Sequence, residues 1–131
     1  MANATESLGA ARYVNLATFR RDGREVRTPV WVAEDGGCLY VFSEAKAGKV
    51  KRIRATKRVA VAPCDVRGGL KGDFTEGVGR IVDEGAEPEV VERGYAALKK
   101  KYGWQMLLAN FFSTLSGRIH QRALLELRLE D

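Results

Sequence analysis

Two tight-turn sequences near the start of the chain constrain its fold more than any other feature. Asp22-Gly23 separates two stretches rich in β-branched and aromatic residues, 12–19 and 24–33, and Asp35-Gly36-Gly37 separates the second stretch from a third, 38–42. Asp-Gly and Gly-Gly pairs between such stretches are typical of β-hairpin turns. Two hairpins in succession bring antiparallel strands side by side, so we expect an antiparallel sheet.

The rest of the chain contains three more short, strand-like segments. They cover residues 59–62, 74–82 and 123–129. Gly77 and Gly79 in the second of them indicate a bulge or a close approach of another backbone. No repeat or linker interrupts the 131 residues, so we expect one domain over 1–131. The fold class is therefore mostly β, a six-stranded antiparallel barrel that is closed or split.

Helical patterns separate these strands. Segment 46–58 places Val50 and Ile53 on one face, with Ser43 before it as a candidate cap. Segment 88–102 begins with a proline and is followed by Gly103, as helices commonly are. The apolar segment 104–115 is expected to be a further short helix that packs internally or, through Phe111 and Phe112, on a partner subunit.

The positive charge of the chain is concentrated in one place. The formal net charge is +5, and seven lysines and arginines with no acidic residue among them lie between Lys46 and Arg58. Without these seven, 15 basic and 17 acidic residues remain. The segment can hold an anion, or it can be a solvated basic helix face.

Other residue types narrow the function. No apolar run approaches the roughly 18 residues of a membrane span, and the N-terminus lacks a secretory pattern. Cys38 and Cys64 lack metal-type spacing and are expected to be reduced thiols of a cytoplasmic protein. The single histidine, His120, argues against a histidine-rich metal site and against most hydrolase schemes.

Two segments are candidate binding sites. Residues 43–49, Ser-Glu-Ala-Lys-Ala-Gly-Lys, lead from a strand into a helix, where free backbone N–H groups favour anions and Gly48 allows close approach. Residues 27–31, Arg-Thr-Pro-Val-Trp, contain Pro29, which predicts a missing ladder hydrogen bond at a sheet edge or bulge. Trp31 is either a flat binding surface or a packed core residue.

The ordered motifs resemble a known family. They are Tyr13-Val-Asn-Leu-Ala-Thr-Phe19, Thr28-Pro-Val-Trp31, Ser43-x-x-Lys-Ala-Gly-Lys-Val-Lys-Arg52, Val59-Ala-Val-Ala-Pro-Cys-Asp65 and Lys101-Tyr-Gly-Trp104. Together they resemble the pyridoxamine-phosphate-oxidase-like split barrels, and within them a branch of deazaflavin-dependent (coenzyme F420) oxidoreductases. The C-terminus lacks the basic and aromatic residues with which the classical oxidases grip pyridoxal phosphate.

The resemblance implies a six-stranded split barrel that forms a homodimer, with two cofactors at the subunit interface. It implies that Lys46, Ala47, Gly48, Lys49 and Arg52 hold the cofactor phosphate, and that Ser43 touches the phosphate or the ribityl-like chain. It implies that Thr28, Pro29, Val30 and Trp31 line the ring system, that Arg27 beside them belongs to the cofactor site, and that Cys64, Asp65 and Arg67 lie near the groove. The anionic tail of F420 would suit the further cations Lys51, Arg54, Lys57 and Arg58, which can equally be surface charge.

The resulting prediction is an oxidoreductase that transfers hydride between reduced F420 and a small organic acceptor. The alternatives are an FMN-dependent, flavin-reductase-like enzyme and a cofactor-binding protein without turnover. Tyr13, Tyr40, Asp65 and His120 are possible proton donors, each more readily explained as structural. A nucleic-acid-binding barrel is disfavoured because no aromatic residue lies among the cations of 46–58.

Overall fold

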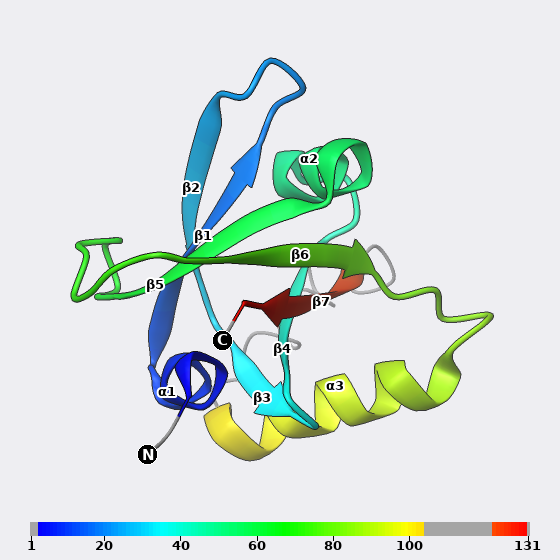
Figure 1. The fold of residues 1–131 in the computed structure, drawn as a ribbon. Coiled ribbons are helices and arrows are strands. Elements are labelled where there is room, and N and C mark those ends of the chain that lie inside the picture. Colours follow the sequence, from blue (N-terminus) through cyan, green and yellow to red (C-terminus); the bar gives the residue numbers. More distant parts are fainter. Residues whose placement is uncertain (1–2, 104–121, 131) are drawn as a thin grey trace.

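Seven antiparallel strands form one curled sheet, a half-barrel, in the computed structural model (Figure 1). The structure describes residues 3–103 and 122–130. The strands are β1 (Tyr13–Phe19), β2 (Glu25–Val30), β3 (Ala33–Asp35), β4 (Cys38–Glu44), β5 (Arg58–Cys64), β6 (Thr75–Ile81) and β7 (Arg122–Leu129). Their order across the sheet is β2-β1-β5-β6-β7-β4-β3. The predicted mostly β split barrel is confirmed, with three helices in the described part.

The prediction of six strands is wrong, because segment 24–33 contains two strands instead of one. The first of them, β2, pairs with β1, whereas β3 pairs with β4 at the opposite edge of the sheet. Trp31 and Val32 carry the chain from one edge to the other. The expected edge position of Pro29 is confirmed, since β2 is an outermost strand of the sheet.

The helices are α1 (Ala4–Ala10), α2 (Gly48–Thr56) and α3 (Pro88–Tyr102). The sequence analysis missed α1, whose signal is Asn3, a capping residue that accepts a hydrogen bond from Glu6 N (2.9 Å). The third helix is confirmed with its proline start and its end at Gly103. The predicted helix 104–115, with Phe111 and Phe112, lies outside the described residues.

The second helix is shorter than predicted at both ends. Ser43 does not cap it, because Ser43 pairs with Ala123 in the β4–β7 ladder and its hydroxyl donates to Glu44 O (3.3 Å). Ala47 occupies the cap position without a side-chain hydrogen bond. At the other end Lys57 adopts a left-handed conformation (φ 61°) that ends the helix, so Arg58 belongs to β5.

The largest core cluster fills the concave side of the sheet and includes residues of α1 and α2. Leu8, Val50 and Ile53 pack there among strand residues such as Leu16 and Leu125. The predicted inward face of α2 is confirmed, since Val50 and Ile53 are both 0% exposed. Figure 1 shows α2 beside the β1–β2 hairpin and α3 along the far end of the sheet.

A second cluster joins α3 to the convex side of β3, β4 and β7. Leu98 and Tyr102 are buried, whereas Val91 and Tyr95 are only half-buried because the helix turns Val90 and Gly94 toward the sheet. A third, small cluster of Ala17, Phe19 and Ala60 lies on the convex side of β1 and β5.

The C-terminal end of α3 is fixed by two polar side chains. Lys101 Nζ donates to the carbonyl oxygens of Gly9 (2.7 Å), Ala11 and Val32. Val32 N donates to the Tyr102 hydroxyl (2.9 Å), which in turn donates to Arg12 O (2.8 Å). These bonds tie α3 to α1 and to the link between β2 and β3.

The predicted close approach at Gly77 is confirmed. A Cβ atom at this position would collide with the carbonyl oxygen of Arg128 on the neighbouring strand β7. Glycine therefore lets β6 and β7 lie close together at this end of the sheet.

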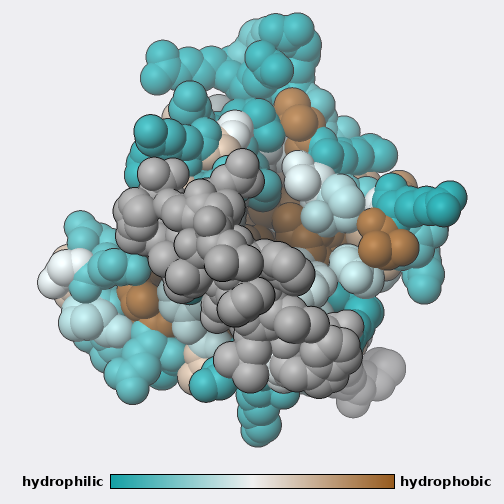
Figure 2. Space-filling view, turned by 180° about the vertical axis from the view of Figure 1, so that it is seen from behind, coloured by the Kyte–Doolittle hydropathy of each residue, from teal (hydrophilic) through white to brown (hydrophobic). Residues whose placement is uncertain are grey.

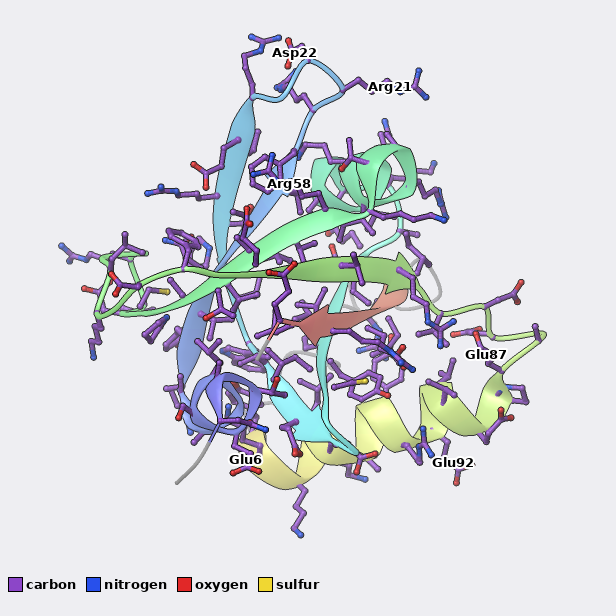
Figure 3. The ribbon with its side chains drawn as sticks, in the orientation of Figure 1. Glu6, Arg21, Asp22, Arg58, Glu87 and Glu92 are labelled. Carbon is purple, nitrogen blue, oxygen red and sulfur yellow. The ribbon has the colours of Figure 1, made fainter. Side chains whose placement is uncertain are left out.

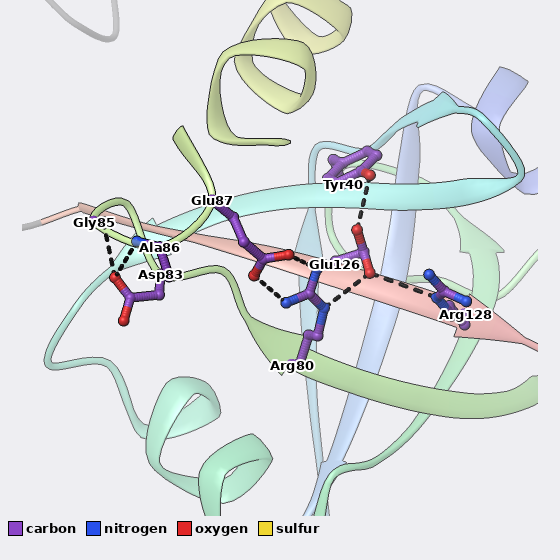
Figure 4. A network of polar contacts seen from close by, with 8 residues as sticks. All are labelled: Tyr40, Arg80, Asp83, Gly85, Ala86, Glu87, Glu126 and Arg128. Carbon is purple, nitrogen blue, oxygen red and sulfur yellow. Dashed lines mark hydrogen bonds and ion pairs between the residues drawn. The ribbon is translucent and has the colours of Figure 1, made fainter. Parts of the chain in front are cut away.

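A buried carboxylate connects the strands β4, β6 and β7 (Figure 4). Glu126 is 4% exposed and accepts hydrogen bonds from the Tyr40 hydroxyl (2.9 Å) and from Arg80 Nε (3.0 Å). Arg80 also pairs with Glu87 at the start of α3. Burial raises the pKa of Glu126, but the bonds from Arg80 and Tyr40 outweigh it, so the net pKa lies below the ordinary value. Burial and the bond to Glu126 raise the pKa of Tyr40 to about 12.

Because its pKa is lowered on folding, Glu126 stabilises the folded state above its ordinary pKa near 4.5 and loses this contribution as the pH falls below that value. We expect Glu126→Gln to cost about 1–3 kcal/mol at pH 7 and to weaken the loss of stability on acidification. Urea denaturation at pH 7 and at acidic pH measures both. Glu92→Gln, at an exposed position of α3, is the control; an equal effect of both variants would contradict the assignment.

Candidate functional site

The start of α2 presents free backbone donors. β4 ends at Glu44, and Ala47 N closes a turn on Glu44 O (3.0 Å). The first bonds back to the start of the helix come from Val50 N (3.1 Å) and Lys51 N (3.3 Å), both to Ala47 O. The N–H groups of Gly48 and Lys49 precede these bonds and point out of the helix end, where they favour an anion.

Arg52 folds back over this first turn. A Cβ atom at Gly48 would lie 2.7 Å from Arg52 Nη1. Only glycine therefore leaves room for the guanidinium group in its observed position. We call the exposed backbone of Gly48 and the adjoining guanidinium of Arg52 the cradle.

The orientation of Arg52 is fixed by strand β1. Arg52 Nε donates to Thr18 Oγ1 (2.6 Å), which leaves the Nη1 and Nη2 groups for another acceptor. One turn further, the Thr56 hydroxyl donates to Phe19 O (3.3 Å). Two bonds thus hold α2 against the end of β1. Burial, and then the neighbouring charge of Arg20, lower the pKa of Arg52.

Lys46 and Lys49 complete the cradle. Lys49 is half-buried, and its pKa is lowered by burial and by the charge of Arg52, with Glu44 opposing. Neither lysine, nor Arg52, has a carboxylate within 4 Å in the described part of the chain. The structure therefore places Gly48 and Lys49 beside Arg52, while Lys46 and Ala47 lie on the turn before α2 and Ser43 lies on the preceding strand β4.

The predicted residues of β2 divide between the two faces of the sheet. Thr28 and Val30 lie opposite Leu16 and Val14 of the inner core, so their side chains share its face. Arg27 and Pro29 alternate with them and point to the convex side, where Arg27 lies over the Phe74 ring (4.6 Å). Val26 pairs with Thr18, the residue that holds Arg52, so β2 is the strand next to the cradle.

Trp31 and Cys64 lie apart from the cradle. Trp31 stacks on Tyr102 of α3, with ring centroids 4.5 Å apart and an interplanar angle of 9°. Cys64 is buried at the end of β5, roughly 20 Å along the strand from the end of α2. Burial, then the charge of Asp65, raise the pKa of its thiol, which makes it a poor nucleophile.

A basic group on the turn between β1 and β2 was not predicted from the sequence. A groove of about 420 Å³ lies between this turn and α2; its lining is Phe19, Arg20, Arg21, Asp22, Arg24, Lys51, Arg52 and Ala55. Figure 3 labels Arg21 and Asp22 at the tip of the hairpin, above α2. The signal was present as Arg20-Arg21-Asp22-Gly23-Arg24, where three arginines surround a turn.

The candidate proton donors have structural partners where the structure describes them. Tyr40 donates to Glu126, and Asp65 accepts hydrogen bonds from the N–H groups of Arg67 (2.9 Å) and Gly69 (2.8 Å) in its own loop. His120 lies outside the described residues. In 3–103 and 122–130 no group of three or more His, Cys, Asp or Glu could hold a metal ion. No helix in these ranges is long and apolar enough to cross a membrane.

Comparison with known proteins identifies the fold. No protein-family model and no curated protein matches the sequence. Among solved structures, the haem storage protein HutZ of Vibrio cholerae is similar, with a TM-score of 0.70, 15% identity and coverage of 95% of this chain and 85% of HutZ. An FAD-binding protein of Mesorhizobium loti has a TM-score of 0.65 and 20% identity over 97% of this chain and 85% of that protein.

An F420 reductase is also similar, with a TM-score of 0.59 and 20% identity over 100% of this chain and 97% of the reductase. These neighbours are split barrels of the pyridoxamine-phosphate-oxidase-like kind, as the sequence motifs predicted. The fold is thereby established, and it serves both redox enzymes and a storage protein.

Substitutions of Thr18 test whether its hydroxyl holds Arg52 in position. We expect Thr18→Val to lower the free energy of unfolding by about 1 kcal/mol, because Arg52 Nε loses its acceptor, and Thr18→Ser to cost less because it retains a hydroxyl. Urea denaturation of the two variants measures the difference. Equal losses would mean that the methyl group of Thr18, rather than its hydroxyl, carries the contribution.

Proposed function

We propose that the chain is an oxidoreductase of the split-barrel type that binds coenzyme F420 at the start of α2 and transfers hydride between the reduced cofactor and a small organic acceptor. The observation that carries the proposal is the cradle of Gly48, Lys49 and Arg52, which offers unpaired donors to a phosphate beside an edge strand. The likeness of the fold to an F420 reductase and to an FAD-binding protein supports it.

In this proposal, the residues of the chain bind the cofactor and orient it. The N–H groups of Gly48 and Lys49 and the guanidinium of Arg52 donate to the phosphate, and Lys46 adds charge. Beside them, Thr28 and Val30 offer a half-buried surface to the ring system, next to the backbone of Pro29, which has no N–H to donate. When bound, the deazaflavin supplies the two-electron hydride chemistry, while the protein supplies position and electrostatics.

FMN is the alternative cofactor for the same cradle. Its single phosphate satisfies the same donors, and an FAD-binding protein shares the fold. The two cofactors differ in colour and in the length of their anionic chain. A yellow preparation with flavin absorption bands would favour FMN.

Titration of the purified protein with F420 and with FMN, followed by fluorescence, tests the proposal. We expect F420 to bind at micromolar concentration or below, and Arg52→Gln to weaken binding about tenfold through loss of a charge-assisted hydrogen bond. Arg54→Gln removes the same charge from an exposed position of α2 outside the cradle and should change affinity less than twofold. Failure to bind either cofactor, or equal effects of both variants, would contradict the site.

Turnover separates an enzyme from a binding protein. The similar haem storage protein shows that this fold also serves storage. Oxidation of bound, reduced F420 by an added organic acceptor, observed as a return of the oxidised cofactor's absorption, would support the enzyme. Saturable binding without oxidation by any acceptor would favour a storage protein.

We further infer that two copies of the chain form a dimer through the convex side of β1, β5 and β6. The three helices of the described part pack inside the curl or on β3, β4 and β7, so no helix covers this side, which is contacted by Phe74 and by the loop at Gly68. Val78 of β6 is 57% exposed there. In the view from behind, the rim of the molecule is hydrophilic and apolar residues lie beside the central area (Figure 2). Because Arg27 and Pro29 point to the convex side, a second copy would adjoin the cofactor strand.

The mass in solution tests this arrangement. We expect a dimer at micromolar concentration by light scattering, and a shift to monomer in Val78→Lys, because a buried, unpaired ammonium group is costly at an interface. Ala96→Lys adds the same charge to the exposed side of α3 and should remain dimeric. A monomeric wild-type protein, or dissociation of both variants, would contradict the interface.

A further inference from the structure

The groove between the β1–β2 turn and α2 holds more cations than its own carboxylates can neutralise. Five of its lining residues are arginine or lysine and one, Asp22, is acidic. Asp22 already pairs with Arg24 (Nε to Oδ2, 2.8 Å). In the described part of the chain, Arg20, Arg21, Lys51 and Arg52 have no carboxylate within 4 Å.

These like charges are held together by the fold. Arg52 is fixed to Thr18 (2.6 Å), and Thr56 is bonded to Phe19 O (3.3 Å), so α2 cannot move away from the hairpin. Arg20 lies close enough for its positive charge to repel that of Arg52. Arg20, Arg21 and Lys51 are exposed, and a cluster of cations on such a fixed backbone attracts an ion of the opposite sign.

From this groove we infer a second anion site, which takes a chain of two or more anionic groups, such as an oligophosphate or an oligocarboxylate. The groove volume of about 420 Å³ is within the range of small-molecule pockets and exceeds the needs of one small anion. Cations line both walls of the groove: Arg20 and Arg21 belong to the turn, and Lys51 and Arg52 belong to the helix. This arrangement suits an extended ligand that lies between the two walls.

The groove lacks what a nucleic acid would need. Phe19 is the aromatic residue in its lining, but it is buried, and the guanidinium of Arg58 lies 4.0 Å from the centre of its ring. No base can stack on a ring that is covered in this way. The groove therefore offers no base a ring to stack on, and its cations are what favour an anionic ligand.

The site is separate from the phosphate cradle except at Arg52, which borders both. The inference therefore does not require the proposed function. The chain of anionic groups can come from a free polyanion, or from the far end of a cofactor whose phosphate occupies the cradle.

Isothermal titration with inorganic tripolyphosphate and with orthophosphate at low ionic strength tests the site. We expect tripolyphosphate to bind at least tenfold more tightly than orthophosphate, and Lys51→Gln and Arg20→Gln each to weaken it about fivefold to tenfold, the range of one charge-assisted hydrogen bond. Arg54→Gln is the matched control, because Arg54 is also an exposed cation of α2 but lies outside the groove.

Three results would overturn the inference. They are equal affinities for the two phosphates, an equal loss in Arg54→Gln, and binding of single-stranded DNA through Lys51 and Arg20 without binding of tripolyphosphate. Circular dichroism of each variant verifies that it is folded, so that lost binding is not mistaken for lost structure.

Titration of the same variants with the two cofactors shows where the chain of anionic groups comes from. If Lys51→Gln and Arg20→Gln weaken F420 but not FMN, the groove holds the tail of the cofactor. If both cofactors bind unchanged while tripolyphosphate binding is lost, the groove holds a separate ligand. If neither cofactor binds the wild-type protein, the proposed function fails while the tripolyphosphate result stands.

Discussion

The candidate site depends on the packing of α2 against the half-barrel. Val50 and Ile53 are completely buried in the core inside the curl, and burial of two such side chains contributes about 3–6 kcal/mol. The Arg52–Thr18 bond then sets the rotation of the helix against β1. Because the cations of the helix alternate with these buried residues, fixing one face of the helix fixes the positions of all of them.

This arrangement has an electrostatic cost that hydrophobic burial offsets. Lys49 and Arg52 are partly removed from water, and the positive charge of Arg52 repels that of Lys49. The pKa values of both groups are lowered. A chain selected for stability alone would place a carboxylate among them, as it does at Glu126, where Arg80 and Tyr40 surround a buried acid. The charges around Glu126 neutralise one another, whereas the cations at α2 have no carboxylate among them. This difference is the physical reason to interpret the cluster at α2 as a candidate binding site.

Local patterns in the sequence predicted what is local in the structure. The spacing of Val50 and Ile53 identified the inward face of α2, and the turn pairs identified both hairpins. The errors concern partners that are distant along the chain. Segment 24–33 is uniformly strand-like, so nothing local shows that it changes partner from β1 to β4. Ser43 looks like a helix cap because its pairing with Ala123, 80 positions away, is invisible in the local sequence.

The same distinction between local and distant partners explains why the sequence predicted only part of the candidate site. Counting charge along the chain identified 46–58 but grouped residues that the fold separates: Lys51 faces the groove, whereas Arg58 pairs with Glu76 on the convex side. It also omitted Arg20 and Arg21, which the β1–β2 hairpin brings to α2 from some 30 positions away. A charge cluster in three dimensions is defined by strand pairing. Alternate residues of β2 face the core side and the convex side of the sheet, so the strand divides one sequence motif between these two faces.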